Sequence, residues 1–309
     1  MDDLPSVSTI VCTYNRASLL REALASLLTQ DYLAPREIIV VDNNSVDETP
    51  EVVRSLTGTS NVPLLYATER QQGLSYARNR GIELAQGDVL TFLDDDALAG
   101  PGWLRALAMA HIRYQADVVG GPVLLAWRCA RPMWWVAELD GFLSAMHYGD
   151  QAKQAVFPLF PYGGNLSIRR ELLVKAGGFC AELGRSGKAL LEAEEMELLL
   201  RLERLGARTW YTPDAIVYHV VQADRASKPY LRRRCIGSGR SQARLDALVD
   251  RRRLIRRWLK TIARFVSPIH WSYWLATLDF LRECRLRVDA GYVWEGARYL
   301  LRPRPAQPV

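Results

Sequence analysis

Asp-Val-Leu-Thr-Phe-Leu-Asp-Asp-Asp, residues 88–96, is the most informative stretch of the chain. The apolar run Val89–Leu93 has the length of a buried strand, and it ends at three carboxylates, Asp94, Asp95 and Asp96. Carboxylates this close repel one another unless a cation lies among them. A divalent metal meets that need, and such metals often take a substrate phosphate as a further ligand. The stretch predicts a strand-end site for a metal and a phosphorylated substrate; the alternative is a solvated turn without a ligand.

Strand-like and helix-like segments alternate on both sides of this run. The predicted strands are 7–12, 37–42, 62–67 and 89–93, and the predicted helices are 18–28, 48–56, 74–85 and 102–114. This order implies a mainly parallel α/β sheet with helices on both faces. Ligands bind outside the carboxyl ends of the strands in such sheets. Three of the strands end in polar residues there, namely 13–16, 42–45 and 94–96. Their convergence favours a ligand site over a solvated turn.

Composition is ordinary for a globular protein. The chain has 309 residues, of which 49% are hydrophobic and 24% charged. The N-terminus is acidic and its first apolar run is only strand length, so we expect no signal peptide. The five cysteines are widely spaced without a C-x-x-C motif. They fit neither a disulfide framework nor a zinc site, and they predict reduced thiols in a cytoplasmic protein.

Charge is distributed unevenly along the chain. Residues 1–222 hold 20 Lys and Arg against 27 Asp and Glu, a net charge of −7. Residues 223–309 hold 20 against 7, a net charge of +13. A shift of this size predicts a boundary near residue 222 and different partners for the two parts. We therefore expect a catalytic domain over 1–222 and a basic helical extension over 223–309.

Residues 251–265 of the extension predict an amphipathic helix, with Leu254 and Trp258 on one face and arginines on the other. Trp271 and Trp274 follow. This pattern is typical of interfacial membrane binding, which would place a cytoplasmic enzyme at the inner face of the cell membrane. The alternative is a helical hairpin packed on the catalytic domain with solvated arginines. Nucleic-acid binding is the least favoured interpretation.

Aromatic residues also gather in the less regular segment 120–190. Trp127, Trp134 and Trp135 fit three roles equally well, namely a sugar-stacking platform, a buried cluster and a membrane-facing patch. A helix is predicted over 193–205, followed by short strands at 207–211 and 215–220.

Eight segments in one sequence order resemble the signatures of glycosyltransferase family 2. They are Val-Ser-Thr-Ile-Val-Cys-Thr-Tyr-Asn-Arg (7–16), Ile-Val-Val-Asp-Asn-Asn-Ser-Val-Asp-Glu-Thr (39–49), Gly-Leu-Ser-Tyr-Ala-Arg-Asn-Arg-Gly (73–81), Phe-Leu-Asp-Asp-Asp (92–96), Gly-Gly-Asn-Leu-Ser-Ile-Arg-Arg (163–170), Gly-Gly-Phe (177–179), Glu-Ala-Glu-Glu-Met-Glu-Leu (192–198) and Val-Tyr-His (217–219). The resemblance covers residues 6–222. It implies the Rossmann-like GT-A fold of nucleotide-diphosphosugar transferases. It also implies inverting transfer of a sugar from a nucleotide sugar, UDP by default, to a glycan or lipid-linked acceptor in polysaccharide or glycoconjugate synthesis.

The resemblance assigns nucleotide-sugar binding to Thr13, Tyr14, Arg16, Asp42, Asn44, Arg78, Asp94 and Asp95. It places a divalent cation, Mn²⁺ or Mg²⁺, on Asp96 and His219, and it places Gly164 and Asn165 in the donor or acceptor pocket. The cation takes up charge as the nucleoside diphosphate leaves. Alternatives remain for several of these residues: a loop acceptor for Asp42, a packing aromatic for Tyr14, an ion pair with Asp94 for Arg78, and a packed imidazole for His219.

An inverting transfer needs a general base that deprotonates the acceptor hydroxyl. Glu194 and Glu195 lie at the start of a predicted helix and point about 100° apart. The family usually has Glu-Asp here, with the second acid as the base, so the resemblance assigns the base to Glu195. Because Glu replaces Asp in this chain, the assignment between Glu195 and Glu194 stays open.

Two other classes of protein compete with this interpretation. A sugar nucleotidyltransferase needs a glycine-rich basic loop after the first strand, and residues 13–16 contain no glycine. A non-catalytic binding protein would have lost the aspartate cluster or the glutamate pair, and both are present.

Overall fold

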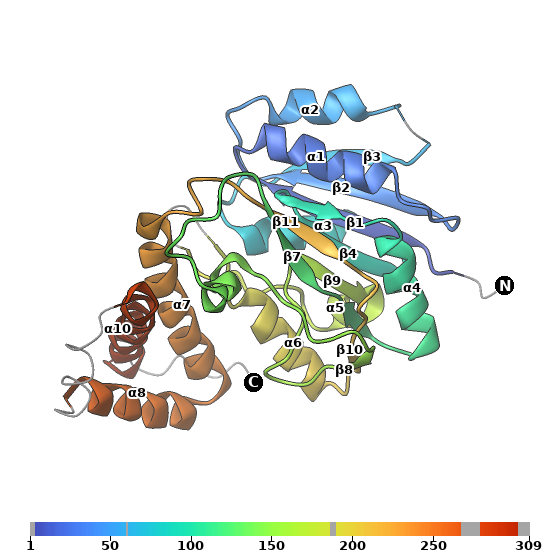
Figure 1. Cartoon of the computed structure of the whole chain (residues 1–309). Coiled ribbons are helices and arrows are strands. Elements are labelled where there is room, and N and C mark those ends of the chain that lie inside the picture. Colours follow the sequence, from blue (N-terminus) through green and yellow to red (C-terminus); the bar gives the residue numbers. More distant parts are fainter. Residues whose placement is uncertain (1–3, 60, 186–189, 267–278, 302–309) are drawn as a thin grey trace.

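A large sheet of eight strands forms the centre of the molecule (Figure 1). The computed structural model describes residues 4–59, 61–185, 190–266 and 279–301. The strands of this sheet are β1 (Val7–Thr13), β2 (Arg36–Asp42), β3 (Leu64–Thr68), β4 (Val89–Asp94), β6 (Val118–Gly120), β8 (Lys153–Gln154), β9 (Asn165–Arg169) and β10 (Thr209–Tyr211). Their spatial order is β3-β2-β1-β4-β9-β6-β10-β8.

The register of the parallel strands brings the predicted strand ends together. Thr13 at the end of β1 pairs with Asp42 at the end of β2, and Cys12 pairs with Asp94 of β4. The three polar strand ends therefore share one edge, as the alternating pattern predicted. The strand predicted at 62–67 begins two residues later, at Leu64, because Pro63 has no N–H to donate to the ladder.

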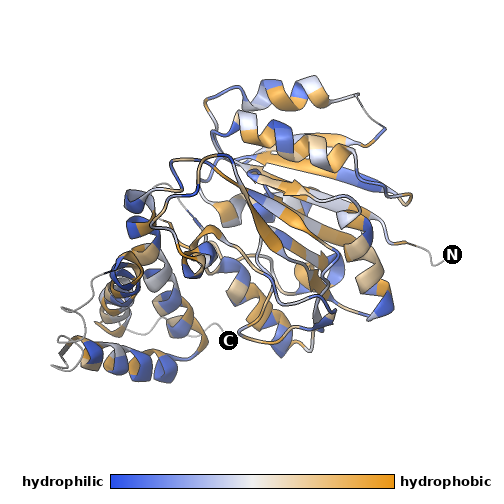
Figure 2. Cartoon of the chain, viewed as in Figure 1, coloured by the Kyte–Doolittle hydropathy of each residue, from blue (hydrophilic) through white to orange (hydrophobic). Residues whose placement is uncertain are grey.

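Helices cover both faces of the sheet. One hydrophobic core packs the sheet against α1 (Ala17–Leu28), α2 (Thr49–Leu56) and α4 (Trp103–Arg113). The other packs it against α3 (Leu74–Leu84), α5 (Arg170–Lys175) and α6 (Glu194–Arg204). Successive residues of β2 alternate between the two cores, because side chains on a strand point to opposite faces. Figure 2 shows the resulting concentration of hydrophobic residues in the central strands.

The sequence did not predict β9, which lies antiparallel between β4 and β6. The prediction of a mainly parallel sheet with helices on both faces is confirmed, with this antiparallel insertion added. The strand follows Gly163-Gly164, and the segment around it lacks the regular alternation that marks the first four strands.

A second, smaller sheet holds the chain just beyond the three aspartates. It consists of β5 (Ala97–Ala99), β11 (Val217–Val221) and β7 (Val123–Trp127). The chain leaves the large sheet at Asp94 and enters the small one at Ala97, so that Asp95 and Asp96 form the turn between them. His219 pairs with Ala97 across the small sheet. This pairing brings residues more than a hundred positions apart to the same edge.

The C-terminal helices α7 (Lys228–Val249), α8 (Arg251–Val266) and α10 (Phe280–Leu301) pack against one another. Glycines allow α7 and α10 to approach closely, since a Cβ atom on Gly239 would lie 1.9 Å from the carbonyl oxygen of Val288. Ion pairs then join the helices. Asp246, which is 1% exposed, pairs with Arg253 and Arg257 of α8. Many of the arginines are therefore engaged between helices.

The tryptophans of the irregular segment form a packed cluster. Trp127 and Trp135 meet edge to face at 5.1 Å between ring centroids, and the ring of Trp134 lies 4.9 Å from that of Phe280 at the start of α10. Of their three predicted roles, the structure supports the packed cluster. Trp271 and Trp274 lie outside the described residues. Within the described part of the chain, no helix combines the length and the apolarity that a membrane crossing requires.

Candidate active site

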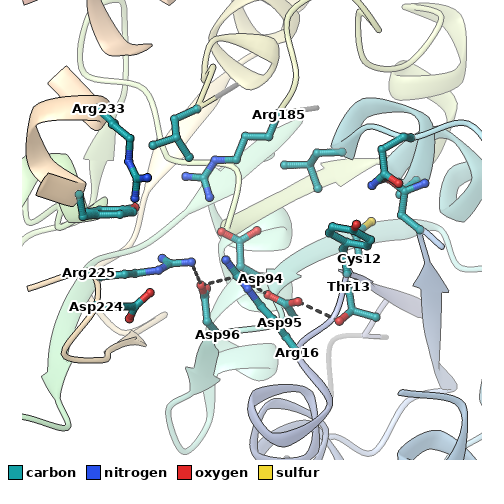
Figure 3. A pocket seen from close by; sticks show the side chains of 17 residues that line it. Cys12, Thr13, Arg16, Asp94, Asp95, Asp96, Arg185, Asp224, Arg225 and Arg233 are labelled. Atoms are coloured by element: carbon teal, nitrogen blue, oxygen red, sulfur yellow. Dashed lines mark hydrogen bonds and ion pairs between the residues drawn. The ribbon is translucent and has the colours of Figure 1, made fainter. Parts of the chain in front are cut away.

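A cavity of about 330 Å³ opens beside the carboxyl ends of β1 and β4 (Figure 3), a volume typical of ligand sites. We call it the strand-end cavity. It is lined by Cys12, Thr13, Tyr14, Arg16, Asn43, Gln72, Leu74, Ala77, Asp94, Asp95, Asp96, Arg185, Leu190, Asp224, Arg225, Tyr230 and Arg233. The predicted residues Thr13, Tyr14 and Arg16 and the three aspartates thus meet at one cavity.

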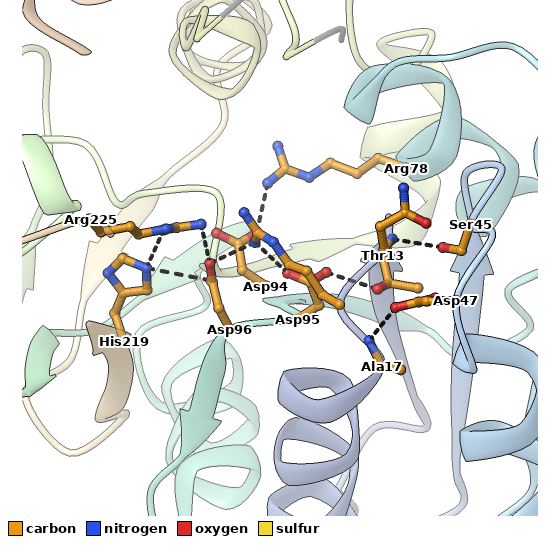
Figure 4. A network of polar contacts seen from close by, with 12 residues as sticks. Thr13, Ala17, Ser45, Asp47, Arg78, Asp94, Asp95, Asp96, His219 and Arg225 are labelled. Atoms are coloured by element: carbon orange, nitrogen blue, oxygen red, sulfur yellow. Dashed lines mark hydrogen bonds and ion pairs between the residues drawn. The ribbon is translucent and has the colours of Figure 1, made fainter. Parts of the chain in front are cut away.

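Asp95 ties the turn after β4 to the loop after β1 (Figure 4). Thr13 Oγ1 donates a hydrogen bond of 2.8 Å to one carboxylate oxygen, and Arg16 Nη1 donates one of 2.8 Å to the other. Burial raises the pKa of Asp95, although the charge of Arg16 opposes this. Both oxygens of Asp95 have partners within the protein, so its side chain fixes the position of Arg16.

Asp96 carries the strongest charge pairing at the site. Its carboxylate oxygen Oδ2 lies 2.7 Å from Arg16 Nη1 and 2.6 Å from Arg225 Nη2. Burial alone would raise the pKa of Asp96, but the charges of Arg225 and Arg16 beside it hold this pKa well below its usual range. Asp96 is therefore an anion despite being only 3% exposed.

His219 lies with its Nε2 atom 3.5 Å from Asp96 Oδ1. Its Nδ1 atom is 2.7 Å from the carbonyl oxygen of Leu143, and Arg225 Nη1 is 2.9 Å from Nε2. A carbonyl only accepts, so Nδ1 carries the proton and Nε2 presents a lone pair. This is the tautomer that a metal-ligating histidine needs, with its other ring nitrogen held by a carbonyl.

The lone pair of His219 and the carboxylate of Asp96 both need a cation between them. In the structure the Arg225 guanidinium supplies it by contacting both groups. The described residues contain no group of three or more His, Cys, Asp and Glu side chains arranged to hold a metal. Asp96 and His219 thus fit a Mg²⁺ or Mn²⁺ site only as a pair whose remaining ligands come from substrate phosphates or water.

Arg78 connects the aspartate cluster to the glutamate pair. This buried guanidinium lies 2.9 Å from Glu194 Oε1 and 3.4 Å from Asp94 Oδ1. Two glycines make room for the network: a Cβ atom on Gly163 would lie 2.8 Å from Arg78 Nη2, and one on Gly164 would lie 2.6 Å from Asp94 Oδ2. The backbone of Gly163-Gly164 must therefore pass close to these charges, which explains why this position lacks side chains.

The two glutamates differ in their hydrogen bonding. Glu194 accepts from Arg78 through Oε1 and from the N–H of Ala193 through Oε2. Glu195 Oε2 is buried and has no hydrogen-bond partner in the described part of the chain. Burial, followed by the charge of Glu194, raises the pKa of Glu195 to about 8. A carboxylate with a free oxygen and a pKa near neutrality is suited to accept a proton.

A small cavity of about 40 Å³ adjoins these carboxylates, and we call it the junction. Its lining includes the predicted residues Arg78, Asp94, Gly164, Glu194, Glu195 and His219. Since Asp94 lines both the junction and the strand-end cavity, the glutamate pair lies next to the space beside the strand ends.

Asn165, a predicted pocket residue, does not line either cavity. Its side chain is fully buried, with the amide nitrogen donating to the carbonyls of Pro122 and Ala215 and the amide oxygen accepting from Trp103 Nε1. Asn165 begins β9, where its side chain serves packing between strands and α4. In the part of the chain that the structure describes, this side chain has a structural role, and its place in a donor or acceptor pocket stays a prediction.

Asp42 and Asn44 also lie outside both cavities. Asp42 Oδ1 accepts from the N–H of Ser45 and Oδ2 accepts from the Tyr66 hydroxyl, as its alternative interpretation as a loop acceptor predicted. Asn44 has a positive φ of 70° and donates to the carbonyl of Arg70. Asn43, which the sequence analysis did not select, lines the strand-end cavity instead.

Sequence reasoning missed Arg185 and Arg225, two cations on the far side of the strand-end cavity (Figure 3). Arg233 lies there too, and it belongs to the basic run 232–234 that the sequence offered as a segment able to close over a diphosphate. Arg225 follows His219 by six residues, and a basic residue so close to a candidate metal ligand was a usable signal. Arg185 lies in an irregular segment between α5 and α6 and carried no such signal.

Comparison with known proteins agrees with the geometry. Residues 8–176 match the family model "Glycosyl transferase family 2". A glucosyl-dolichyl phosphate glucuronosyltransferase of Haloferax volcanii is 30% identical over 248 residues, which are 78% of this chain and 78% of the relative.

Solved structures share the fold. A mannosyltransferase from Pyrobaculum calidifontis, in complex with GDP-Man and Mn²⁺, superposes with a TM-score of 0.63 at 21% identity, covering 97% of this chain and 88% of that one. S. aureus TarS, in complex with UDP-GlcNAc, gives 0.57 at 18% identity, covering 96% and 91%. The family match, the relative and the shared GT-A fold together show that this chain is a glycosyltransferase and belongs to glycosyl transferase family 2.

Proposed function

We propose that this enzyme transfers a sugar from a nucleotide diphosphate sugar, UDP-linked by default, to a hydroxyl of a lipid-linked or glycan acceptor with inversion at the anomeric carbon. The observation that carries the proposal is the free, buried oxygen of Glu195 beside a cavity lined by arginines and aspartates. The arginines suit a diphosphate, and the free carboxylate oxygen suits an acceptor proton.

Each residue then has a task in the transfer. Glu195 takes the proton of the acceptor hydroxyl, whose oxygen forms the new bond to the anomeric carbon. The bond from that carbon to the phosphate oxygen breaks, and its electron pair leaves with the nucleoside diphosphate. Arg185, Arg225 and Arg233 line the cavity where this charge develops, and fixed cations stabilise developing charge. Arg78 holds Glu194, whose charge helps to keep Glu195 basic.

Asp96 and His219 would hold a divalent cation, Mn²⁺ or Mg²⁺, together with the donor phosphates. Such an ion supplies neutralisation for the departing diphosphate. The Mn²⁺ in the Pyrobaculum structure supports a divalent cation for this enzyme, without indicating which residues hold it. Arg225 bridges the same two side chains in the structure, so it must give way when the ion binds.

The acceptor class follows from the relatives. The Haloferax relative is named for glucosyl-dolichyl phosphate, which supports a lipid-linked acceptor for this chain. The donor nucleotide is less constrained, since GDP and UDP each appear in a structural neighbour.

The test is incubation with radiolabelled UDP-, GDP- and dTDP-sugars and Mn²⁺, with and without EDTA. We expect hydrolysis of one donor, loss of that activity with EDTA, and its loss in Glu195→Gln. Glu203→Gln is the matched control, because Glu203 lies exposed on the same helix and lines none of these cavities. Absence of donor binding and of hydrolysis with every nucleotide sugar would reject the function.

We further propose that residues 223–309 form an extension that contacts the inner face of the cell membrane. The apolar residues Leu254 and Trp258 are packed against α7 and α10, so this contact must use the opposite face of α8. That face, which we call the α8 basic face, is exposed and carries Arg252, Ile255, Arg256, Leu259, Lys260 and Arg264. Its charges and two aliphatic side chains suit an anionic lipid surface.

Flotation with vesicles containing anionic lipid tests the membrane contact. Arg256→Glu/Lys260→Glu should lower the bound fraction at least fivefold. The control Arg21→Glu/Arg105→Glu, with the same charge change on exposed positions of α1 and α4, should not. Wild-type protein that stays unbound at low salt would reject the contact.

A further inference from the structure

A second large cavity, of about 340 Å³, lies between Glu195 and α7. Its lining includes Glu138, Tyr162, Glu192, Glu195, Ser238 and Gln242. We call it the α7 cavity. Among the described residues, none lines both this cavity and the strand-end cavity, whereas the junction shares lining residues with each of them. Glu192 and Glu195 line both the junction and the α7 cavity.

We propose that the α7 cavity binds the acceptor, and that it selects a neutral sugar unit over an anionic one. The proposal rests on the transfer reaction proposed above. A direct displacement needs the acceptor hydroxyl between the base and the anomeric carbon. The strand-end cavity holds the cations suited to the donor diphosphate, so the acceptor must reach Glu195 from another side. The α7 cavity reaches the same residue and has room for a sugar.

The base itself points to this cavity. Glu195 Oε2 is buried and has no hydrogen-bond partner among the described residues. An unpaired buried carboxylate oxygen is costly, and a bound hydroxyl removes that cost. The junction, at about 40 Å³, holds little more than the reacting atoms, so the rest of the acceptor must occupy the larger space.

The chemistry of the lining indicates the class of acceptor. None of the described residues that line the α7 cavity is Lys or Arg, whereas four arginines line the strand-end cavity. Glu138 is exposed and forms no ion pair with another described residue. Glu192 is already paired with Arg234. A carboxylate or phosphate on the sugar unit held in this cavity would meet repulsion from Glu138, and from Glu195 once it is ionised to act as the base, with no Lys or Arg among the described lining residues to offset it.

Neutral hydroxyl groups find partners here instead. Ser238 and Gln242 lie one turn apart on α7 and therefore on the same side of the helix. Phe142, Met196 and Leu245 supply apolar surface for the C–H face of a sugar ring. The helix is fixed closely at this point, because a Cβ atom on Gly237 would lie 2.3 Å from the carbonyl oxygen of Leu190.

Ser238 and Gln242 lie beyond residue 176, where the match to the family model ends. The C-terminal helices thus take part in choosing the acceptor. This role is independent of any contact of α8 with a membrane.

The test compares transfer with donor hydrolysis. Octyl β-D-glucopyranoside and octyl β-D-galactopyranoside serve as neutral acceptors, and octyl β-D-glucuronide serves as the anionic one. We expect wild-type kcat/KM for the better neutral acceptor to exceed that for the glucuronide at least tenfold. Glu138→Gln should narrow this ratio to below threefold. Equal use of the glucuronide, or hydrolysis without transfer to either neutral glycoside, would overturn the proposal.

Gln242→Trp fills the cavity and should lower transfer at least tenfold, while the Kd for the nucleotide and the rate of donor hydrolysis stay within twofold. Leu248→Trp adds the same bulk to an exposed position of α7 and should change neither. If Gln242→Trp fails to fold, Ser238→Ala tests the same cavity, and we expect it to raise the acceptor KM threefold or more. Unchanged acceptor kinetics in the folded variant would overturn the proposal, whereas a wild type that neither binds nor hydrolyses any nucleotide sugar would reject the transfer function itself.

Discussion

Carboxylates at the strand ends and carboxylates among the C-terminal helices are both paired with arginines, but their surroundings differ. Asp95 and Asp96 line the strand-end cavity. Asp246 and Glu295, each about as buried, line none of the cavities described above and join α7, α8 and α10. A charge beside a cavity is available to a ligand, whereas a charge enclosed between helices acts on stability. The same pairs of residue types therefore separate into a catalytic set and a structural set.

Substitution of Glu195 is the strongest test of the catalytic set. Glu195→Gln should lower transfer about 10³-fold, since it removes the general base. The same change should stabilise the fold. The folded-state pKa of about 8 lies above the usual value, so the folded protein holds the proton of Glu195 more tightly than the unfolded chain does. This contribution to the free energy of unfolding is fully present below the unfolded-state pKa and is lost as the pH rises through 8. We expect a Tm gain of about 3 °C at pH 9 and almost none at pH 4. A variant that kept wild-type activity would move the base to another residue.

Asp246→Asn tests the structural set. Asp246 is buried, whereas Arg253 and Arg257 are partly exposed, so loss of its charge-assisted hydrogen bonds should cost about 2 kcal/mol of unfolding free energy. Donor hydrolysis per folded molecule should stay within twofold. Asp289→Asn is the control, because its pair with Arg264 is more exposed and should contribute below about 1 kcal/mol. Urea unfolding measures the free energy of unfolding of both variants. Equal losses in Asp246→Asn and Asp289→Asn would contradict the greater contribution expected from the more buried carboxylate.

The pH dependence of hydrolysis and transfer sharpens the comparison further. A base must be deprotonated to act, and burial together with Glu194 raises the pKa of Glu195 to about 8. The kcat/KM for transfer should therefore rise about tenfold per pH unit below 8 and level off above it. Initial rates between pH 6 and 9.5 measure this. A profile that is flat over this range would show that Glu195 does not control the rate.

The smallest predicted effect concerns the competition between the Arg225 guanidinium and a divalent cation for Asp96. Because Arg225 bridges Asp96 and His219, removing it should tighten Mn²⁺ binding in the absence of nucleotide. We expect Arg225→Ala to lower the Kd for Mn²⁺ about tenfold, which is about 1.4 kcal/mol. Arg233 lines the same cavity, but among the described residues the ion pairs of Asp96 are with Arg16, His219 and Arg225. Arg233→Ala should therefore leave the Kd for Mn²⁺ unchanged. Calorimetric titration distinguishes the two, and weaker binding in Arg225→Ala would contradict the exchange.

The sheet and its polar edge were predictable because local patterns determine them. The apolar runs of β1, β2 and β4 have strand length, and parallel pairing then brings Thr13, Asp42 and Asp94 to one edge. The side-chain directions at that edge were less predictable. Asp42 satisfies Ser45 and Tyr66 rather than facing the cavity, because the loop after β2 turns back on itself.

The other part of the site depends on contacts between distant segments. Asn165 was expected in a pocket, yet it begins an antiparallel strand that the sequence pattern did not reveal. Arg185 and Arg225 come from irregular segments that only the packed structure brings to the aspartates. Glu195 Oε2 is left without a partner because Arg78 donates to Glu194 instead. The backbone of Gly163-Gly164 passes close to the Arg78 guanidinium and helps to fix it in this position.

The hydrogen bond between His219 and Leu143 has a thermodynamic consequence. Leu143 ends the short helix η1 (Ala137–Leu143), and residues of that helix, Glu138, Gly141 and Phe142, line the α7 cavity. The Nδ1 side of the His219 imidazole is therefore hydrogen-bonded to η1, which lines the α7 cavity, while its Nε2 side faces Asp96. A ligand in the α7 cavity that shifts η1 must also reorient the imidazole. Occupancy on the two sides is then linked, and such linkage is reciprocal: each ligand alters the affinity of the other by the same factor.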